Sequence, residues 1–293
     1  MNVATMSPAE RQQLVDRFYW YHSIEFGDNV TTRGVVNHAA AFPRYGFPSL
    51  VGQSVLDIGA SDGYFAFAFE RLGASRVVAT DVNRWRDTSK MDTPAKTKGR
   101  RQQKWAPFAG QEDDYRQREQ LAGDLGLETP NPFHLAHRLL DSKAEFRYGS
   151  IYDLAELNEQ FDVVFAGTVT THLQDIPAAF EAMRAVTRRQ AVIACADLLD
   201  SSPRSGWRWL AYQAIRSVST IAGLQDEFPM VRERPVALYT ANTGGAIWRP
   251  SAACIIEMLL SAGFRDVHVF SRFTLDNLRH HTKMKHVVFH AYV

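Results

Sequence analysis

The sequence has few cysteines, no long apolar run and almost no net charge. Its two cysteines, Cys195 and Cys254, are too few among 293 residues for a disulfide framework or a thiolate metal cage. No stretch reaches the roughly 18 apolar residues that a membrane span needs. The first residues also lack the apolar core of a secretory signal. These absences predict a cytoplasmic chain with no membrane partner.

The charges of the chain nearly cancel, since 33 lysines and arginines accompany 32 acidic residues. A net charge of +1 argues against a protein that wraps nucleic acid by bulk electrostatics. One local exception lies between Arg84 and Lys104, where eight basic side chains accompany two acidic ones. Such a run is typical either of a solvated loop or of a surface that contacts phosphates.

The hydrophobic residues, 45% of the chain, are arranged as alternating strands and helices. Two buried strands are predicted at 54–59 and 75–81, on either side of a helix over Tyr64–Leu72. Further strands are predicted at 145–150, 161–167 and 191–197. This alternation predicts an α/β fold with a Rossmann-like, doubly wound sheet of five parallel strands.

The carboxyl-terminal region departs from the alternation. A helix is predicted over Ser251–Ala262, followed by strands at 266–273 and 286–293. Only Thr274–Lys285 separates these two strands, which is too short for a helical crossover, so they are predicted to pair antiparallel. The complete prediction is a seven-stranded sheet with five parallel strands and an antiparallel carboxyl-terminal pair.

Other regions are predicted to cover this sheet. Ser7 begins a capping box, which predicts an N-terminal helix that reaches about Tyr21. Apolar residues repeat at helical spacing from Trp207 to Ile221, which predicts a cap whose exposed surface could mediate a homodimer. The predicted organisation is an N-terminal helix and lid segment at 1–48 and a main domain at 49–293, with insertions at 83–133 and 200–250.

A glycine-containing turn after the first strand predicts a nucleoside site. The turn includes Asp57, Gly59 and Gly63, and Asp81 ends the next strand. Glycines let a ligand approach the backbone, and an acid at the end of the second strand can accept both hydroxyls of a ribose. A dinucleotide site would need glycine in place of Ser61. Asp57 would also repel a pyrophosphate, whereas it would attract a cationic sulfonium or ammonium group.

This pattern resembles the first motif of the class I S-adenosylmethionine (SAM)-dependent methyltransferases, acidic-x-Gly-x-Gly-x-Gly, with Ser61 at the middle glycine. Within that family, YHSIEF, TRG, SIYD and VTTH are similar to the subgroup related to the tRNA wobble-uridine methoxy and carboxymethyl transferases. The resemblance implies SAM as the cofactor. In the carboxymethyl-transferring relatives an aromatic hydroxyl residue stands at the position of Thr171, so the ordinary methyl donor is expected.

The resemblance also implies a set of cofactor contacts. Gly59, Ser61 and Gly63 would line the methionine moiety, with Asp57 near its cationic groups. Arg33 would clamp a carboxylate from the N-terminal segment. The other implied contacts are Asp81 and Asn83 at the ribose, Ser150, Ile151 and Tyr152 at the adenine, and Gly167 and Thr168 under the sulfonium.

Methyl transfer from a sulfonium is an in-line displacement that needs positioning more than acid–base chemistry. For a hydroxyl or protonated amine acceptor a base helps, and His172 after the fourth strand is the first candidate. His22 in the lid segment is the second and Asp197 the third. His172 could instead cap the helix that begins near Asp175. No catalytic metal is predicted, because the tail histidines, His280, His281, His286 and His290, lack a metal-ligand spacing.

Several functions are consistent with these residues. The leading hypothesis is a SAM-dependent methyltransferase that acts on a small-molecule acceptor such as a specialised metabolite. A second keeps SAM but makes a tRNA wobble uridine the acceptor, which the basic run favours and the near-neutral net charge disfavours. A nicotinamide-dependent oxidoreductase and a non-catalytic SAM-binding interaction module are the alternatives from other classes.

Overall fold

The computed structural model describes residues 3–82, 112–127, 129–196, 198–199, 235–240 and 246–293. At its centre lies a seven-stranded sheet with the order β3-β2-β1-β4-β5-β9-β8. The strands are β1 (Ser54–Ile58), β2 (Arg76–Asp81), β3 (Glu145–Tyr148), β4 (Phe161–Gly167), β5 (Thr187–Ala196), β8 (Asp266–Asn277) and β9 (Thr282–Tyr292). Strands β1 to β5 run parallel, and β9 pairs antiparallel with both β5 and β8. The predicted sheet is confirmed.

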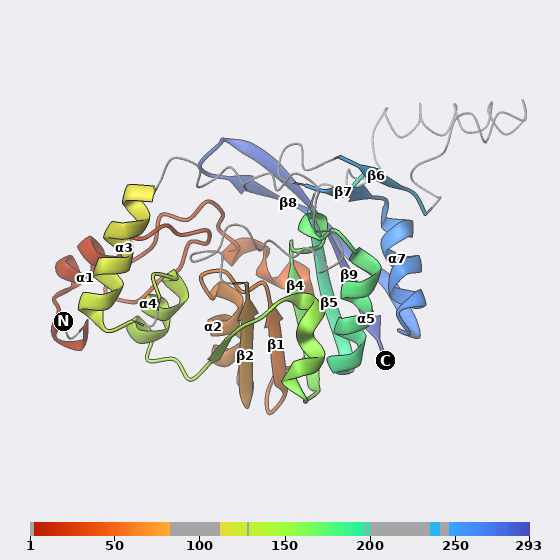
Figure 1. Cartoon of the computed structure of the whole chain (residues 1–293), viewed down its shortest axis with the longest axis horizontal. Coiled ribbons are helices and arrows are strands. Elements are labelled where there is room, and N and C mark those ends of the chain that lie inside the picture. Colours follow the sequence, from red (N-terminus) through yellow and green to blue (C-terminus); the bar gives the residue numbers. More distant parts are fainter. Residues whose placement is uncertain (1–2, 83–111, 128, 197, 200–234, 241–245) are drawn as a thin grey trace, which may run out of the picture.

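Helices cover both faces of this sheet (Figure 1). On β1, Val55 packs in one hydrophobic core with α2, whereas the next residue, Leu56, packs in a second core with α5. This follows from the alternation of side chains along a strand. The helices are α1 (Pro8–Val15), α2 (Tyr64–Arg71), α3 (Glu112–Leu125), α4 (Pro132–Leu139), α5 (Ile176–Val186) and α7 (Ala252–Ser261), with 3-10 turns η1 (Val3–Thr5), η2 (Ala39–Tyr45), η5 (Ile151–Leu157) and η6 (Thr170–His172).

The N-terminal helix begins as predicted but ends early. Ser7 forms the capping box, in which its hydroxyl accepts from the Glu10 backbone and the Glu10 carboxylate accepts from the Ser7 backbone. The helix ends at Val15 rather than near Tyr21. The indole N–H of Trp20 donates to the Val15 carbonyl at 2.8 Å, which holds the chain in a turn after the helix.

The final two strands are longer than predicted. Most of the expected loop at 274–285 belongs to β8 and β9, and only residues 278–281 form the turn. Asp276 lies opposite Lys283, and their side chains form an ion pair at 2.6 Å. Cross-strand pairs of opposite charge stabilise the polar end of this hairpin. Because that end has no alternation of apolar and polar residues, the sequence pattern did not reveal the full length of β8 and β9.

Residues 19–36, predicted as part of a lid, pack against the sheet and its carboxyl-terminal hairpin. The apolar side chains Trp20, Ile24, Phe26 and Val30 are buried in the same core as α2. Val36 forms a β-bridge with Asn277 of β8, and the Leu278 backbone N–H donates to the Val35 carbonyl at 2.7 Å. The amino- and carboxyl-terminal parts of the chain therefore lie side by side.

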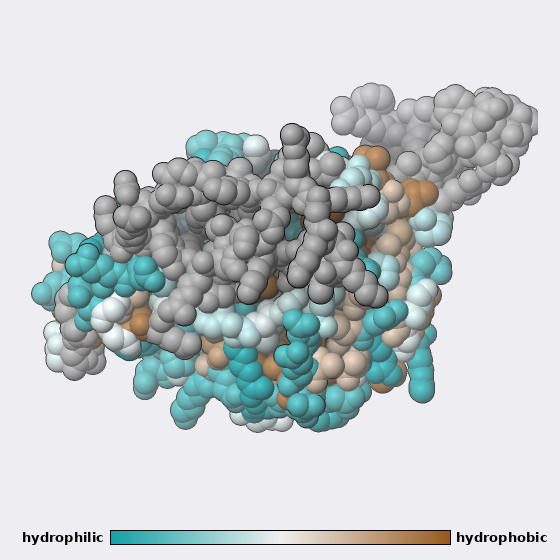
Figure 2. Space-filling view, viewed as in Figure 1, coloured by the Kyte–Doolittle hydropathy of each residue, from teal (hydrophilic) through white to brown (hydrophobic). Residues whose placement is uncertain are grey.

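The two predicted insertions are described in part. The first contains α3, and the second contributes a two-stranded sheet of β6 (Ala237–Tyr239) and β7 (Trp248–Pro250). The basic run from Arg84 to Lys104 and the helical pattern from Trp207 to Ile221 lie outside the described residues. Figure 2 shows hydrophobic residues gathered near β6 and β7, where Leu238 is exposed. No helix in the described ranges is long and apolar enough to cross a membrane.

Candidate active site

The predicted nucleoside turn connects β1 to α2 in a backbone conformation that suits small residues. Gly59, Ser61 and Gly63 all have positive φ, at 73°, 54° and 89°. A Cβ atom on Gly59 would lie 2.5 Å from a methyl of Val169, just after β4. The turn therefore approaches the end of β4 closely, and the positive φ explains the glycines at 59 and 63, whereas Ser61 adopts a φ that residues with a Cβ rarely take.

Replacing Gly63 by alanine is expected to lower the free energy of unfolding by about 2–4 kcal/mol. The new Cβ would lie 2.6 Å from Cδ2 of Phe133, a buried ring, and the positive φ would add backbone strain. Gly27→Ala is a matched control, because Gly27 has a similar φ of 83° but nothing within 4 Å of a Cβ. Urea unfolding of both variants measures the difference, and equal losses would contradict the packing argument.

Asp81 joins this turn to the end of β2. One of its carboxylate oxygens accepts from the Ser61 backbone at 2.8 Å, and the other accepts from the Val82 backbone at 2.7 Å. The backbone of Gly59 also donates to Thr80 at 2.8 Å. The structure thus brings Asp81 to the turn, at the place where the ribose contact is predicted.

Asp57 lies beneath the turn and has an unsatisfied carboxylate oxygen. Its side chain is only 2% exposed, and Oδ2 is one of two fully buried polar side-chain atoms without a hydrogen bond in the described part of the chain. Burial, together with the nearby Asp81, raises the pKa of Asp57 to about 8. A cationic ligand would compensate this buried carboxylate, so the residues present fit a sulfonium or ammonium group.

The segments that follow β3 and β4 complete the carboxyl edge of the sheet. Gly149 donates from its backbone to the Asp81 carbonyl at 3.0 Å, which places Ser150, Ile151 and Tyr152 next to the end of β2. Gly167 ends β4, and Thr168 follows it with a φ of 59°. All five residues therefore lie at the edge where the turn after β1 lies.

His22 is paired with Asp62, an acid of the turn that sequence reasoning missed. The Asp62 side chain is completely buried, and one of its oxygens accepts from the Tyr21 and His22 backbones at 2.8 Å each. The other oxygen is hydrogen-bonded to Nδ1 of His22. The signal that could have revealed this residue is an acid directly before Gly63, but its partner lies 40 positions earlier in the chain.

The comparisons with known proteins agree with this geometry. A family model described as "Methyltransferase domain" matches residues 36–269. The chain belongs to this methyltransferase family. It is a methyltransferase. SAM as its cofactor stays the prediction that the motif after β1 implies. A search of curated protein sequences found no significant match.

Solved structures show the same fold as the methyltransferase. The N-terminal domain of EvdMO1 with S-adenosylhomocysteine (SAH) bound matches with a TM-score of 0.54 and 13% identity over 100% of both chains. The same domain in the presence of SAH and D-fucose gives a TM-score of 0.53, with the same identity and coverage. Magnesium protoporphyrin IX methyltransferase from Synechocystis PCC 6803 gives 0.41 and 15% identity over 86% of this chain and 78% of that one. The tRNA subgroup and the nicotinamide-dependent alternative gain no support from these matches.

His172, the first predicted base of the methyltransferase, lies in η6 and is partly exposed. Its backbone donates to the Val169 carbonyl at 3.0 Å. It does not cap the following helix, because the Asp175 side chain does so by accepting from the Ala178 backbone at 3.0 Å. A catalytic role for His172 stays a prediction, as does the one for Asp197, which lies outside the described residues together with Asn83.

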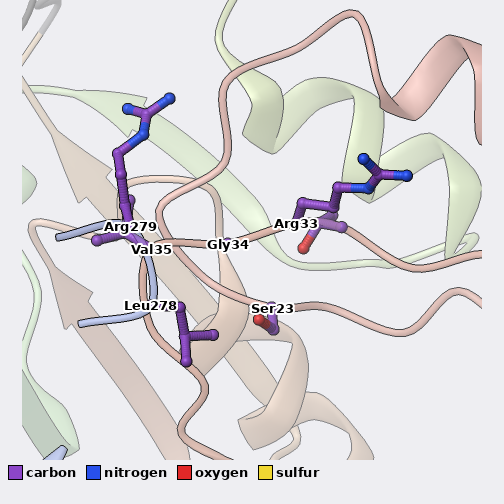
Figure 3. Close-up of a pocket in the computed structure, with 7 residues that line it drawn as sticks. Ser23, Arg33, Gly34, Val35, Leu278 and Arg279 are labelled. Atoms are coloured by element: carbon purple, nitrogen blue, oxygen red, sulfur yellow. The ribbon is translucent and has the colours of Figure 1, made fainter. Parts of the chain in front are cut away.

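Arg33 is exposed and lines a surface hollow of about 450 Å³. Figure 3 shows its side chain on one side of the hollow and those of Arg279 and Leu278 on the other, with Ser23 between them. The described lining contains no residue of the turn after β1. The clamp role for Arg33 in the methyltransferase therefore stays a prediction.

Proposed function

We propose that the methyltransferase transfers the methyl group of SAM to a small-molecule acceptor and that His22, oriented by Asp62, accepts the acceptor's proton. The observation that carries this proposal is the hydrogen bond between His22 Nδ1 and the buried Asp62 carboxylate. A carboxylate oxygen can only accept, so Nδ1 carries a proton, and in the neutral ring Nε2 then keeps its lone pair. A histidine held in this way is ready to act as a base.

Residues at the carboxyl ends of β1 and β2 are suited to hold the cofactor. Asp57 would face its cationic groups, Asp81 its ribose hydroxyls, and the backbone of the turn after β1 its methionine part. When bound, SAM supplies a methyl group activated by a positively charged sulfur. The acceptor atom forms a bond to this carbon as the carbon–sulfur bond breaks and the electron pair stays on sulfur. The acceptor's proton moves to His22 Nε2.

The surroundings of His22 support a small acceptor. Its side chain is 8% exposed, and its ring lies 5.4 Å from that of Tyr64 and 5.8 Å from that of Phe65, centroid to centroid. Both aromatic residues belong to α2, directly after the turn. A buried base of this kind favours a compact acceptor over the surface of a folded RNA.

Transfer of a labelled methyl group tests the proposal. Wild-type protein is incubated with methyl-tritiated SAM and a cell extract separated into a low-mass fraction and an RNA fraction. We expect label in the low-mass fraction, and we expect His22→Ala to abolish it. Label in the RNA fraction instead, or undiminished transfer by His22→Ala, would overturn the proposal. A wild-type protein that binds SAM but labels neither fraction would favour the non-catalytic module.

A further inference from the structure

Three buried histidines lie together at the carboxyl edge of the sheet. His22, His38 and His286 are 6%, 3% and 1% exposed and come from the 19–36 segment, the start of η2 and β9. The ring of His38 lies 5.1 Å from that of His22 and 6.5 Å from that of His286. His286 Nε2 lies 3.5 Å from the hydroxyl oxygen of Thr168, which follows β4. We call these three residues the histidine cluster.

A metal site does not explain the histidine cluster. In the described residues no group of three or more metal-ligating side chains is arranged to hold an ion. The Nδ1 atoms of the three rings are hydrogen-bonded to Asp62, Tyr45 and Met284. Thr168, which faces His286, lies at the same edge of the sheet as the turn after β1, so the cluster borders the predicted cofactor site.

The hydrogen bonds of the histidine cluster determine where each ring carries its proton. His286 Nδ1 donates to the Met284 carbonyl at 3.1 Å, so this ring, like that of His22, keeps its lone pair on Nε2. His38 differs, because its Nδ1 faces the Tyr45 hydroxyl at 2.9 Å. Burial raises the pKa of Tyr45, so the hydroxyl keeps its proton. His38 Nδ1 is the only partner that the described residues give this buried hydroxyl, so the hydroxyl satisfies its proton by donating to Nδ1. His38 then carries its own proton on Nε2.

His38 also stays uncharged. Burial lowers its pKa well below the usual range, and the neighbouring His22 and His286 add to this effect. Among the described residues the Nε2 atoms of His22 and His38 have no hydrogen-bond partner, yet they are not among the fully buried unsatisfied atoms. Each of these nitrogens therefore keeps a hydrogen-bonding capacity that the described residues do not use.

We infer that His22 and His38 together bind the acceptor and select a neutral hydroxyl group, an alcohol or a phenol. The hydroxyl donates its proton to the lone pair of His22 Nε2, while its oxygen accepts a hydrogen bond from the Nε2–H of His38. An ammonium group has no lone pair for His38, so it would leave a buried donor unsatisfied. In the reaction the oxygen–methyl bond forms, the methyl–sulfur bond breaks with its electron pair on sulfur, and the hydroxyl proton passes to His22.

This inference rests on the proposed function, and the acceptor class tests it separately. Turnover is measured as SAH release with two matched pairs of probes, benzyl alcohol with benzylamine and cyclohexanol with cyclohexylamine. Binding is measured separately, from the nitrogen NMR signals of the histidine rings in the protein with SAH bound. We expect turnover, or perturbation of the His22 and His38 signals at high probe concentration, with the alcohols only. Turnover of the amines that depends on His22 would overturn the hydroxyl assignment but keep the proposed function. Undiminished turnover by His22→Ala would overturn both, and probes that perturb neither ring would overturn the inference.

Tyr45→Phe tests the role of His38 without removing an imidazole. Loss of the phenol frees His38 Nδ1, so its ring should divide between two tautomers, visible in the nitrogen NMR spectrum, and methylation of an alcohol should fall about tenfold. SAH affinity should not change. Tyr292→Phe is the matched control, because the Tyr292 hydroxyl also faces a histidine nitrogen, Nδ1 of His290, at 3.4 Å. Tyr292 lies six residues from His286 along β9. A wild-type His38 that is charged or protonated on Nδ1 at neutral pH would overturn the assignment, as would equal effects of the two variants.

Discussion

Asp57→Asn is expected to weaken SAM binding about 100-fold while it stabilises the unliganded protein. The carboxylate of Asp57 is buried, one of its oxygens has no hydrogen bond, and its pKa is raised to about 8. With a cation bound, removing this charge loses a buried ion pair, and 100-fold in affinity corresponds to about 3 kcal/mol. Without the cation, the buried group must either stay charged in an apolar site or take up a proton, and asparagine avoids both costs.

The direction of the pH effect follows from the raised pKa. Between pH 4 and 8 the folded protein holds a proton on Asp57 that the unfolded chain has lost, so the stability from this group falls as the pH rises. The advantage of Asp57→Asn in free energy of unfolding should therefore grow over this range, to a few kcal/mol at pH 8. Thermal unfolding at several pH values, without ligand, measures this difference.

Ligand binding should have the opposite pH dependence. A cation favours the ionised carboxylate, so binding releases a proton and SAM affinity should rise by up to about tenfold per pH unit between pH 6 and 7.5. Calorimetry in two buffers of different ionisation enthalpy detects the proton. Asp162→Asn is the control. Burial raises the pKa of Asp162, but hydrogen bonds from Ser54 and Arg188 outweigh this effect and hold the pKa low. This variant should therefore be less stable than the wild type and bind SAM with normal affinity. A SAM affinity of Asp57→Asn equal to that of the wild type would contradict the role of Asp57.

His22→Ala is expected to lower the rate of methyl transfer by about 10²–10⁴-fold, the range for loss of a general base. SAM affinity should stay within a few-fold of the wild type, because His22 contacts Asp62 and aromatic rings rather than the residues assigned to the cofactor. Single-turnover rates with bound SAM and a hydroxyl acceptor separate the two effects.

His172→Ala is the comparison that distinguishes the two candidate bases. The Asp62 carboxylate orients the ring of His22. The acid near His172, Asp175, instead caps the backbone of α5. Methyl transfer by His172→Ala should therefore remain within about tenfold of the wild type. A large loss for His172→Ala together with a small one for His22→Ala would reverse the assignment.

The fold could be predicted because its signals are local. Buried strands such as β1 and β4 are short apolar runs, and the turn from Asp57 to Gly63 combines positive φ with close backbone approach, which restricts the residue types. The extent of β8 was not predictable in the same way. Ion pairs between β8 and β9, such as Asp276 with Lys283, stabilise the end of β8. Pairs between two strands leave no periodic pattern in the sequence of either strand.

The site was predicted less completely, because its partnerships join distant residues. Asp81 follows from the family motif, whereas the pairing of His22 with Asp62 and of His38 with Tyr45 appears only when the N-terminal segment packs on α2. His286 was considered only for metal spacing, yet it faces Thr168 from the antiparallel strand β9. Spacing along the chain does not reveal such contacts.

The most direct test is a calorimetric titration of the wild type and of Asp81→Ala with SAM, with circular dichroism to check that both are folded. The carboxylate of Asp81 connects the turn after β1 to the end of β2, where the ribose is expected. We predict one site per chain in the wild type and a loss of affinity of at least about 30-fold, or about 2 kcal/mol, in the variant. Equal binding by both proteins, or binding of a reduced nicotinamide dinucleotide in place of SAM, would contradict the account.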